Sequence, residues 1–348
     1  MAKRKPITVA VVGLGRSGWD IHVRQIQDDP RYRIVDVTDM QADRRREAER
    51  TLGCGSFAEF APMLKKTEAE LIVVASPSHL HAKQTVAALK SGRHVVVEKP
   101  AAQTMRDFDR MVEAADQAKK HLLVHLNYRW MRTFTFMQDV LKSKKLGKVF
   151  HIGWLIHGFG RRSDWQCLQA HGGGLLNNHG SHMLDQMLRL IDSPIETVMA
   201  DMKHINDAGD AEDHIKVVVR GENGMTGDLE ISTAAATRLG HIEFLGTAGS
   251  MVIQQGKAHL KYFDPRKVKP LKLSKKLVAA NRQYASDRSM PWIEEHLPVE
   301  GRDVGGFYDS VVDTVRGGRK FPVKAEENRE MMRVMALCRK QNPKFRGR

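Results

Sequence analysis

The sequence predicts a doubly wound α/β domain followed by a second domain that is mainly antiparallel sheet. The first 125 residues alternate short apolar runs with amphipathic helical stretches, a pattern typical of parallel strands covered by helices on both faces. Beyond residue 145, apolar residues instead alternate along longer segments that end in turn signals, which is typical of antiparallel strands. The length of 348 residues fits two domains, and we expect them at 1–125 and 126–348.

In the first domain, strands are expected as short β-branched runs and helices as the amphipathic stretches between them. The expected strands are Ile7 to Val12, Arg33 to Val37, Leu71 to Ala75, His94 to Val97 and Leu122 to His125. The expected helices are Arg16 to Gln27, Ala42 to Leu52, His79 to Lys90 and Met105 to Lys119. Because strands and helices alternate, the sheet should be parallel.

The second domain is expected to contain seven strands and three helices. The strands are Lys148 to His157, Glu196 to His204, His214 to Arg220, Gly227 to Thr233, His241 to Leu245, Ser250 to Gln255 and His259 to Phe263. The helices are about His179 to Ile191, Val304 to Val315 and Glu326 to Arg339. The stretch Pro265 to Gln283 is rich in Lys and Pro, and we interpret it as a basic arm.

Composition indicates a globular protein of the cytoplasm. Hydrophobic residues make up 41% and charged residues 28% of the chain. The longest apolar runs are far shorter than the about 20 residues that span a bilayer, so no membrane helix is expected. The basic start lacks a signal-peptide core, and Cys54, Cys167 and Cys338 are scattered and odd in number. We therefore expect reduced thiols.

The net charge is +15, and the basic excess lies mainly in the last part of the chain. From residue 257 onward there are 22 basic and 11 acidic side chains. Such an excess fits a nucleic-acid partner, an anionic substrate or a solvated basic face. No recognised nucleic-acid-binding motif accompanies it, so we expect no specific nucleic-acid partner. A basic rim that attracts anionic substrates or meets a neighbouring subunit is the preferred interpretation.

A glycine-rich turn follows the first expected strand directly and opens a helix. It reads GxGxxG, with Gly13, Gly15 and Gly18 as the glycines and Arg16 and Ser17 between the last two. Glycines allow a tight turn and let the backbone approach a pyrophosphate, which then rests on the amides at the helix N-terminus. The turn predicts a dinucleotide site.

Asp39 strengthens this prediction. It ends the second strand, 21 residues after Gly18, where a carboxylate accepts hydrogen bonds from both ribose hydroxyls. The same carboxylate repels a 2′-phosphate, so NAD is favoured over NADP. The run Arg44-Arg45-Arg46 keeps NADP possible, since an arginine beyond the acid can accommodate the phosphate.

Four further motifs occur in a fixed order. They are Ser76-Pro77-Ser78-His79-Leu80-His81, Glu98-Lys99-Pro100, Asn127-Tyr128-Arg129-Trp130 and the glycine- and histidine-rich stretch from Gly172 to Asp185. This ordered set resembles the glucose-fructose oxidoreductase and inositol dehydrogenase family (Gfo/Idh/MocA). The resemblance implies a Rossmann domain joined to an α+β domain with a large open, mainly antiparallel sheet, with the substrate bound between them. It also implies a homodimer or homotetramer formed through the open sheet.

The resemblance assigns roles near the nicotinamide. Lys99 matches the lysine that contacts both the substrate hydroxyl and the nicotinamide, and its proton affinity is expected to fall beside the cofactor. Glu98 matches the acid near the nicotinamide ribose. Pro77 and His81 match the loop that packs along the cofactor. The alternative for Lys99 is a structural pair with Glu98.

His182 matches the catalytic histidine of the family, which exchanges a proton with the hydroxyl or orients it. Asn178 stands where the family usually has an aspartate, and an amide cannot accept a proton. Together with Asn178, His179 also resembles a segment of NAD-dependent glycosidases in the same family. We expect Lys99, His182 and Asn178 at the catalytic centre, with His179 in contact with the substrate.

Three interpretations stay open around this centre. Arg129 either contacts the cofactor or substrate, or holds the domain interface. Trp165 is expected in the substrate wall, with a plain loop as the alternative. His179, His182 and Asp185 share one helical face, but the pattern lacks the Glu of HExxH and any Cys, so no metal is predicted.

The leading hypothesis is an NAD(P)-dependent oxidoreductase that transfers hydride between a nicotinamide and a secondary alcohol of a sugar, cyclitol or related polyol. One alternative is an NAD-dependent glycosidase that oxidises a sugar carbon transiently. The other is a non-catalytic dinucleotide-binding sensor, since fold alone does not prove catalysis.

Overall fold

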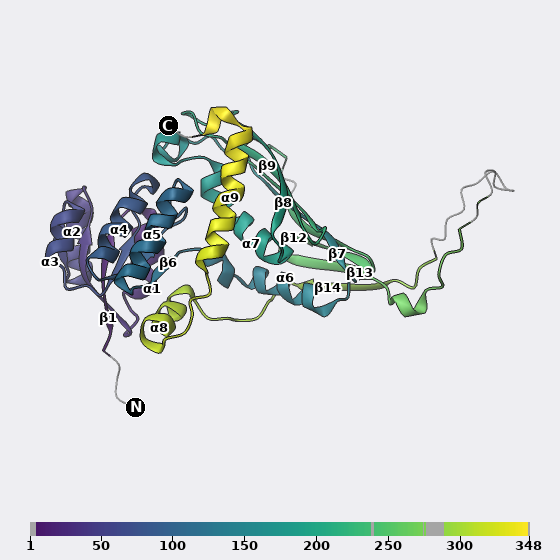
Figure 1. Cartoon of the computed structure of the whole chain (residues 1–348), viewed down its shortest axis with the longest axis horizontal. Helices are drawn as coiled ribbons and strands as arrows, with labels where there is room; N and C mark the ends of the chain where they lie inside the picture. Colours follow the sequence, from purple (N-terminus) through teal and green to yellow (C-terminus); the bar gives the residue numbers. More distant parts are fainter. Residues whose placement is uncertain (1–4, 238–239, 274, 276–288, 347–348) are drawn as a thin grey trace.

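The computed structural model describes residues 5–237, 240–273, 275 and 289–346. The chain forms two sheets with helices between and around them (Figure 1). The expected basic arm, Pro265 to Gln283, is described at residues 265–273 and 275, and its first part forms the short 3-10 helix η7, Pro265–Lys267; the rest of this prediction lies outside the described residues. Among the described residues, no helix is long and apolar enough to cross a membrane.

The first sheet is parallel and six-stranded, in the order β3-β2-β1-β4-β5-β6. Its strands are β1 Ile7–Val12, β2 Tyr32–Thr38, β3 Gly55–Phe57, β4 Leu71–Val74, β5 His94–Val97 and β6 Leu122–Val124. Every residue of β4 and β5 is buried, as expected for central strands with helices on both faces. The strand order reverses between β1 and β4, and ligands of such sheets bind outside the carboxyl ends of the strands at this point. The predicted doubly wound domain is confirmed.

Helices connect these strands close to the expected positions. They are η1 Ser17–Val23, α1 Arg24–Ile26, α2 Ala42–Leu52, α3 Phe60–Lys66, η2 Ser78–Leu80, α4 His81–Lys90 and α5 Met105–Ala118. The expected helix from Arg16 to Gln27 is π-helical over η1 and α-helical only in its last turn, and π turns often mark functional sites. The sequence analysis missed β3 and α3 because they have only three and seven residues.

The second sheet is eight-stranded, in the order β14-β13-β12-β11-β7-β10-β9-β8, and only the β7–β10 pair is parallel. Its strands are β7 Val149–His157, β8 Ile195–Lys203, β9 His214–Gly221, β10 Thr226–Ser232, β11 His241–Gly246, β12 Gly249–Gln254, β13 Lys257–Tyr262 and β14 Ile293–Pro298. The predicted, mainly antiparallel second sheet is therefore confirmed. β14 was not predicted, because its charged Ile-Glu-Glu-His sequence suits an edge strand rather than a half-buried one.

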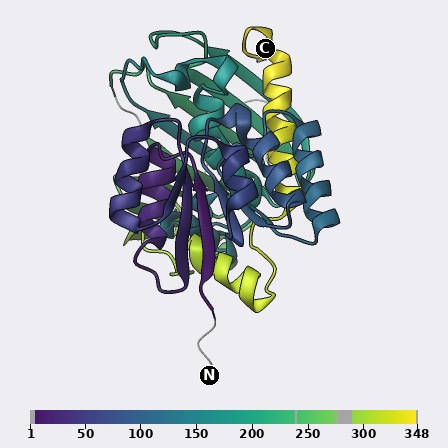
Figure 2. The ribbon, with the colours of Figure 1, turned by 90° about the vertical axis from the view of Figure 1, so that its left-hand side faces the viewer.

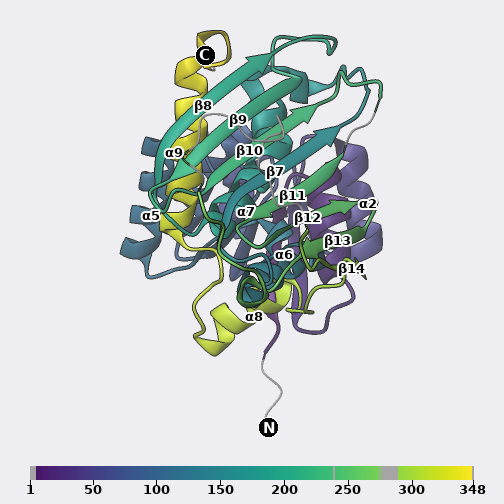
Figure 3. The same cartoon turned by 90° about the vertical axis from the view of Figure 1, so that its right-hand side faces the viewer.

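In the described part of the chain, helices cover one face of this sheet. α6 Arg132–Ser143, α7 Ser181–Ile191 and α9 Ala325–Gln341 lie on the face toward the first sheet (Figure 1). The opposite face is open in the described part of the chain (Figure 3). α6 was not predicted, because it begins with the β-forming sequence Thr-Phe-Thr-Phe and has no side-chain cap.

The helix α8, Phe307–Gly317, returns to the first sheet. Its Phe307, Tyr308 and Val311 share a buried cluster with Val9 and Val11 of β1, and Figure 2 shows α8 beside that sheet. The sheets themselves are built from residues 7–124 and 149–298. The division of the chain into two domains at 125/126 stays a prediction. By sequence, α8 belongs to the second of these domains, but it packs against the sheet of the first. The remaining helices of the described chain are short: η3 Asn127–Trp130, η4 Trp165–Cys167, η5 Gln169–His171, η6 Leu176–Gly180 and η8 Pro343–Phe345.

Candidate active site

The turn between β1 and η1, residues 13–18, is called the cofactor turn below. Gly13 has φ +89°, and a Cβ there would lie 2.7 Å from the Ala75 carbonyl oxygen. A Cβ on Gly18 would lie 1.8 Å from the Gly13 carbonyl oxygen, so both positions exclude any larger residue. A Cβ on Gly15 would instead meet nothing closer than an Arg44 nitrogen at 4.0 Å. The turn is therefore packed from behind and open at Gly15, which is the side that a pyrophosphate approaches.

The rim of the turn carries Arg16, which is exposed, and Ser17, which is half-buried at the start of η1. Asp39 closes the other side: its Oδ2 accepts from the Leu14 amide at 2.8 Å and its Oδ1 from the Gln41 amide at 2.8 Å. Arg44 Nη1 lies 3.4 Å from the same carboxylate. These bonds orient the carboxylate beside the turn, where a ribose of a dinucleotide would lie.

The loops that follow β4 and β5 are tied together by His81. Its Nδ1 lies 2.9 Å from the Pro100 carbonyl oxygen and its Nε2 lies 2.8 Å from that of Ser76. Burial lowers the pKa of His81, although these carbonyls oppose the shift. Pro77 is exposed at the start of η2. His81 is buried, so the geometry favours its holding the loop over touching a ligand itself.

Glu98 lies buried at the end of β5 between two histidines. Its Oε1 is 3.0 Å from His22 Nε2 and 2.9 Å from His125 Nδ1, while its Oε2 accepts from the Lys99 amide at 3.1 Å. Burial alone would raise the pKa of Glu98, but the two histidines outweigh it and hold that pKa well below its usual range. The His22 Nδ1 also lies 2.7 Å from the Tyr308 hydroxyl of α8. The sequence analysis missed both histidines, because their partners are distant in sequence.

Lys99 joins the end of β5 to the segment that leads into α7. Its Nζ donates to the Asn178 carbonyl oxygen at 2.9 Å. Burial lowers the pKa of the Lys99 ammonium; Glu98 opposes this shift, and the charges of Arg162 and Arg16 add to it. A lysine with reduced proton affinity can accept a proton from a hydroxyl group.

The segment before α7 is glycine-rich because it packs against two other loops. Gly174 has φ +97°, and a Cβ there would lie 2.3 Å from Glu212 Oε1. Glu212 is buried, accepts from the Leu176 amide at 2.9 Å, and has its pKa raised to about 7 by burial. The segment then forms the π-helix η6, Leu176–Gly180, which carries Asn178 and His179. Its close packing fixes the carbonyl that Lys99 contacts.

His182 lies in the first turn of α7, 6% exposed, with its ring stacked on Tyr128 at a centroid distance of 4.0 Å. Its Nδ1 has no hydrogen-bond partner among the described residues. Burial and the neighbouring Lys99 lower the pKa of His182 well below its ordinary value, so the ring is neutral near pH 7. Burial, followed by Lys99, also lowers the pKa of His179. Lys99, Asn178, His179 and His182 are called the catalytic cluster below, after the site that the sequence predicts for them.

Arg129 is engaged by carboxylates of two helices. Its Nε and Nη2 donate to Asp185 at 2.7 and 2.5 Å, and its Nη1 donates to Glu327 and to the Pro322 carbonyl oxygen. The guanidinium thus clamps α7 to the start of α9. All of these partners lie within residues 126–348, so the guanidinium holds parts of the second domain to one another, and both expected roles of Arg129 stay predictions. The same guanidinium bonds both carboxylate oxygens of Asp185, which with His179 and His182 formed the possible metal site in the sequence.

Trp165 is 42% exposed on η4. Arg162, just before it, was missed by the sequence analysis, although its charge lowers the pKa of both Lys99 and His179. Its Nε donates to Asp164 at 3.0 Å, and its amide donates to Asp207 at 2.8 Å. The loop that carries Trp165 therefore also places a cation near the catalytic cluster.

Two groups of side chains in the described chain have metal-ligand spacing: His22 with Glu98 and His125, and His259 with Glu294 and His296. In the first group, one carboxylate oxygen bonds both rings. In the second, Glu294 pairs with Lys261 at 2.7 Å and with His259 at 3.2 Å. These contacts account for both groups without an ion.

Comparison with known proteins identifies the family. The model described as oxidoreductase family, NAD-binding Rossmann fold, matches residues 7–126, and the GFO/IDH/MocA C-terminal domain matches residues 134–252. The scyllo-inositol 2-dehydrogenase (NADP(+)) of Bacillus subtilis is 23% identical over an alignment of 352 positions, which covers 94% of this chain and 92% of the relative. The myo-inositol 2-dehydrogenase of Thermotoga maritima is 25% identical over an alignment of 248 positions, which covers 69% of this chain and 73% of the relative.

Solved structures share the fold over nearly the whole chain. An NAD-binding protein from Listeria innocua matches with a TM-score of 0.83 and 24% identity, covering 98% of this chain and 95% of that protein. The WlbA dehydrogenase from Bordetella pertussis, solved with NADH and UDP-GlcNAcA, matches with a TM-score of 0.77 and 23% identity, covering 98% and 96%. With both family domains matched in order over this fold, the chain belongs to the GFO/IDH/MocA family of NAD(P)-dependent oxidoreductases.

Proposed function

We propose that this protein transfers hydride between NAD(P) and a secondary alcohol of a sugar, cyclitol or related polyol. The observation that carries the proposal is the bond of 2.9 Å from Lys99 Nζ to the Asn178 carbonyl oxygen. It joins the carboxyl end of the parallel sheet, where the cofactor turn lies, to the segment that leads into His182. The inositol dehydrogenases among the relatives support this substrate class.

The residues present fit a dinucleotide. The open side at Gly15 leaves room for a pyrophosphate, and Asp39 is already oriented by two amides beside it. When bound there, NAD(P) supplies the hydride acceptor or donor. Arg16 adds a positive charge at the rim of the turn. We assign cofactor contacts to the cofactor turn, to Asp39 and to the loop that Pro77 begins, with His81 holding that loop.

Lys99 and His182 are proposed to handle the proton. Lys99 Nζ, with its lowered pKa, accepts the hydroxyl proton during oxidation and returns it during reduction. The neutral His182 ring, with its free Nδ1, orients the hydroxyl. Glu98 contacts the Lys99 amide and fixes its backbone.

Asn178 is proposed to position groups without exchanging a proton, since its amide is neutral. Its carbonyl holds Lys99, and its side chain is left to bond a substrate hydroxyl. His179 and Trp165 are proposed to contact the substrate beside it. Arg162 extends this wall with a cation, which suits a substrate that carries a carboxylate or phosphate.

NAD is proposed as the preferred cofactor, because the Asp39 carboxylate faces the position of the ribose hydroxyls. Arg44 lies 3.4 Å from this carboxylate and gives a 2′-phosphate one favourable contact. Comparing KM for NADH and NADPH tests the preference. A clearly lower KM for NADPH contradicts it.

A homodimer or homotetramer in the cytoplasm is proposed as the working form. The open face of the second sheet is the proposed contact surface, since helices of the described chain cover only the other face (Figure 3). Cys54, Cys167 and Cys338 are free thiols, which suits a reducing compartment. Light scattering on the purified protein gives the number of subunits, and a monomer at micromolar concentration contradicts the assembly.

A substrate panel tests the proposed reaction. Inositols, aldoses, uronic acids and nitrophenyl glycosides are offered with NAD, and the absorbance of NADH and of nitrophenol is followed together. We expect NADH with at least one polyol or sugar and no nitrophenol release. Nitrophenol release without NADH indicates the transient-oxidation glycosidase, and cofactor binding without either product indicates a sensor.

A further inference from the structure

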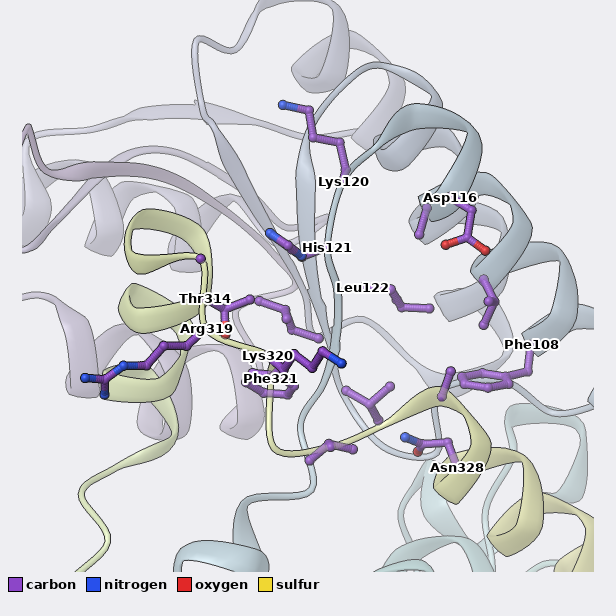
Figure 4. A pocket seen from close by; sticks show the side chains of 17 residues that line it. Phe108, Asp116, Lys120, His121, Leu122, Thr314, Arg319, Lys320, Phe321 and Asn328 are labelled. Atoms are coloured by element: carbon purple, nitrogen blue, oxygen red, sulfur yellow. The ribbon is translucent and has the colours of Figure 1, made fainter.

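A pocket lies beside β6, the edge strand of the first sheet (Figure 4). Its volume is about 350 Å³, within the range of small-molecule sites. The walls come from α5, β6, the end of α8, the connection after α8 and the start of α9. None of the residues that line it belongs to the cofactor turn or to the catalytic cluster.

Two buried side-chain oxygens in this pocket lack a partner. Thr314 Oγ1 and Asn328 Oδ1 have no hydrogen-bond partner among the described residues, and the two residues are 3% and 1% exposed. The Asn328 Nδ2 is satisfied by the Lys324 carbonyl oxygen at 3.1 Å, so only the acceptor side of the amide is free. Buried polar atoms normally have a hydrogen-bond partner. Two acceptor atoms without a partner in one pocket point to a ligand that donates a hydrogen bond.

The remaining walls define the rest of the ligand. Apolar side chains face the pocket from several elements: Phe108, Val112, Leu122, Phe321 and Val323. The lining also carries Lys120, Arg319 and Lys320 against the single carboxylate of Asp116. Arg319 is paired with Asp313, whereas Lys320 and Asn328 point into the pocket in Figure 4. A flat apolar body with a hydroxyl group and an anionic group matches this arrangement.

The pocket shares its wall with the clamp that holds α7. Phe321 and Val323 line the pocket, while the Pro322 carbonyl between them accepts from Arg129 Nη1 at 3.0 Å. Asn328 lines the pocket next to Glu327, which also pairs with Arg129. Arg129 in turn holds Asp185, three residues after His182 in α7. A ligand that orders residues 320–328 therefore acts on the support of the catalytic helix.

We propose that this pocket is an effector site for a small hydroxylated aromatic carboxylate. The hydroxyl group donates to Asn328 Oδ1 or Thr314 Oγ1, the ring packs on Val112 and Phe321, and the carboxylate pairs with Lys320. Binding orders the connection between α8 and α9 and, through Arg129, stabilises α7. The proposal rests on contacts outside the cofactor turn and the catalytic cluster, and it holds whichever reaction the protein catalyses.

The probe for this site is para-hydroxybenzoate, added to the full chain loaded with NAD and followed by calorimetry. Phenol lacks the carboxylate, and benzoate lacks the hydroxyl. We expect para-hydroxybenzoate to bind more tightly than either. The Lys320→Met variant should weaken its binding about tenfold and leave phenol binding unchanged, since one charged contact is lost. The Thr314→Val variant should reduce the ratio between the affinities for para-hydroxybenzoate and for benzoate. The exposed Lys142→Met variant on α6 should leave the affinities for all three compounds unchanged.

Hydrogen exchange locates the effect independently of activity. We expect para-hydroxybenzoate to slow the exchange of backbone amide hydrogens in residues 318–328 and in residues 181–191. Neither segment should be slowed in the Lys320→Met variant. Three results overturn the proposal: no binding of the probe, equal binding by wild type and Lys320→Met, or slowed exchange at 318–328 with none at 181–191. The isosteric Thr314→Val leaves the hydrogen bond from Asn328 Nδ2 to the Lys324 carbonyl oxygen intact, so it separates loss of binding from loss of folding.

Discussion

The cofactor turn and the catalytic cluster are built in different ways. The turn takes its shape from nearby backbone atoms, since added Cβ atoms at Gly13 and Gly18 would collide with carbonyl oxygens. The cluster instead brings Lys99 to Asn178, 79 residues later in the chain, and depends on how the two sheets are placed. Its titration is also set by burial, which lowers the pKa of both Lys99 and His182.

The difference teaches where each kind of function is encoded. A binding turn of this type is a local property that six residues and their strand specify. A proton-transfer cluster needs distant segments, a dry environment and supports such as the Arg129 clamp. Disturbing the turn should therefore affect binding, and disturbing the cluster or its supports should affect turnover or folding while binding persists.

After Lys99 itself, the largest effect in this comparison is expected from His182→Asn. Removing the ring that orients the hydroxyl should lower kcat by about a thousandfold, in the range of lost acid–base groups. The Kd for NADH, from fluorescence titration, should change by less than about threefold, since the turn is untouched. His179→Asn is the neighbouring control and should cost less than about tenfold. A larger loss in His179→Asn than in His182→Asn reverses the assigned roles.

Arg129→Met tests whether the clamp supports the cluster. Its removal leaves the buried Asp185 without its guanidinium partner, while Glu327 keeps Arg189 at 3.2 Å, and breaking a buried pair in this way costs about 3 kcal/mol of unfolding free energy. Urea unfolding measures the loss. Adding Asp185→Asn to Arg129→Met should recover part of the lost unfolding free energy, because the uncompensated carboxylate of Asp185 is then replaced by a neutral amide. Unchanged stability in Arg129→Met shows that the clamp is not a support.

Gly18→Ala and Gly15→Ala form a matched pair at the cofactor turn. The first places a methyl group against the Gly13 carbonyl oxygen and should distort the turn, weakening NADH binding by about a hundredfold. The second meets only open space in the protein, so the fold should keep its stability while NADH binds about tenfold more weakly. Equal binding by Gly18→Ala and wild type contradicts the proposed pyrophosphate site.

The smallest effect concerns His94, at the start of β5, the strand that precedes Lys99. Burial, with His121 and Lys120, lowers the pKa of His94 to about 4. Between this value and the ordinary pKa near 6.5, the unfolded chain binds a proton that the folded chain does not. The contribution of His94 to stability should therefore fall by about 2 kcal/mol as pH drops through this window, and stay level above it.

His94→Asn checks the pH effect, since its amide oxygen can replace Nδ1 as acceptor for the His121 amide. Urea unfolding of the variant between pH 7 and 4 should show a shallower loss of stability than wild type. Parallel curves for the two proteins exclude His94 as the group responsible.

Local patterns predicted most of the fold. The strand β1 with Gly13 after it, and Asp39 at the end of β2, could be recognised because each pattern depends on only a few adjacent residues. The second sheet was also predicted, since most of its strands alternate apolar and polar residues. α6 and β14 were missed because tertiary packing and an edge position override their local propensities.

The site was predictable only in part. The residues of the catalytic cluster were identified by their motifs, but the Glu98 contacts to His22 and His125 link three segments that no local pattern connects. The same holds for Arg129, whose partners on α7 and α9 lie 56 and 198 residues away. Arg162 lies in a loop without a period, so its charge near Lys99 became visible only in three dimensions.

Single-turnover hydride transfer in Lys99→Met tests the central claim most directly. The enzyme is loaded with NAD(P), mixed with the best substrate of the panel, and followed by NADH absorbance, with Lys90→Met on the exposed end of α4 as control. We predict a transfer rate at least about a thousandfold below wild type with NADH affinity within about threefold, and no change in the control. A Lys99→Met rate within about tenfold of wild type, at unchanged NADH affinity, contradicts the assignment.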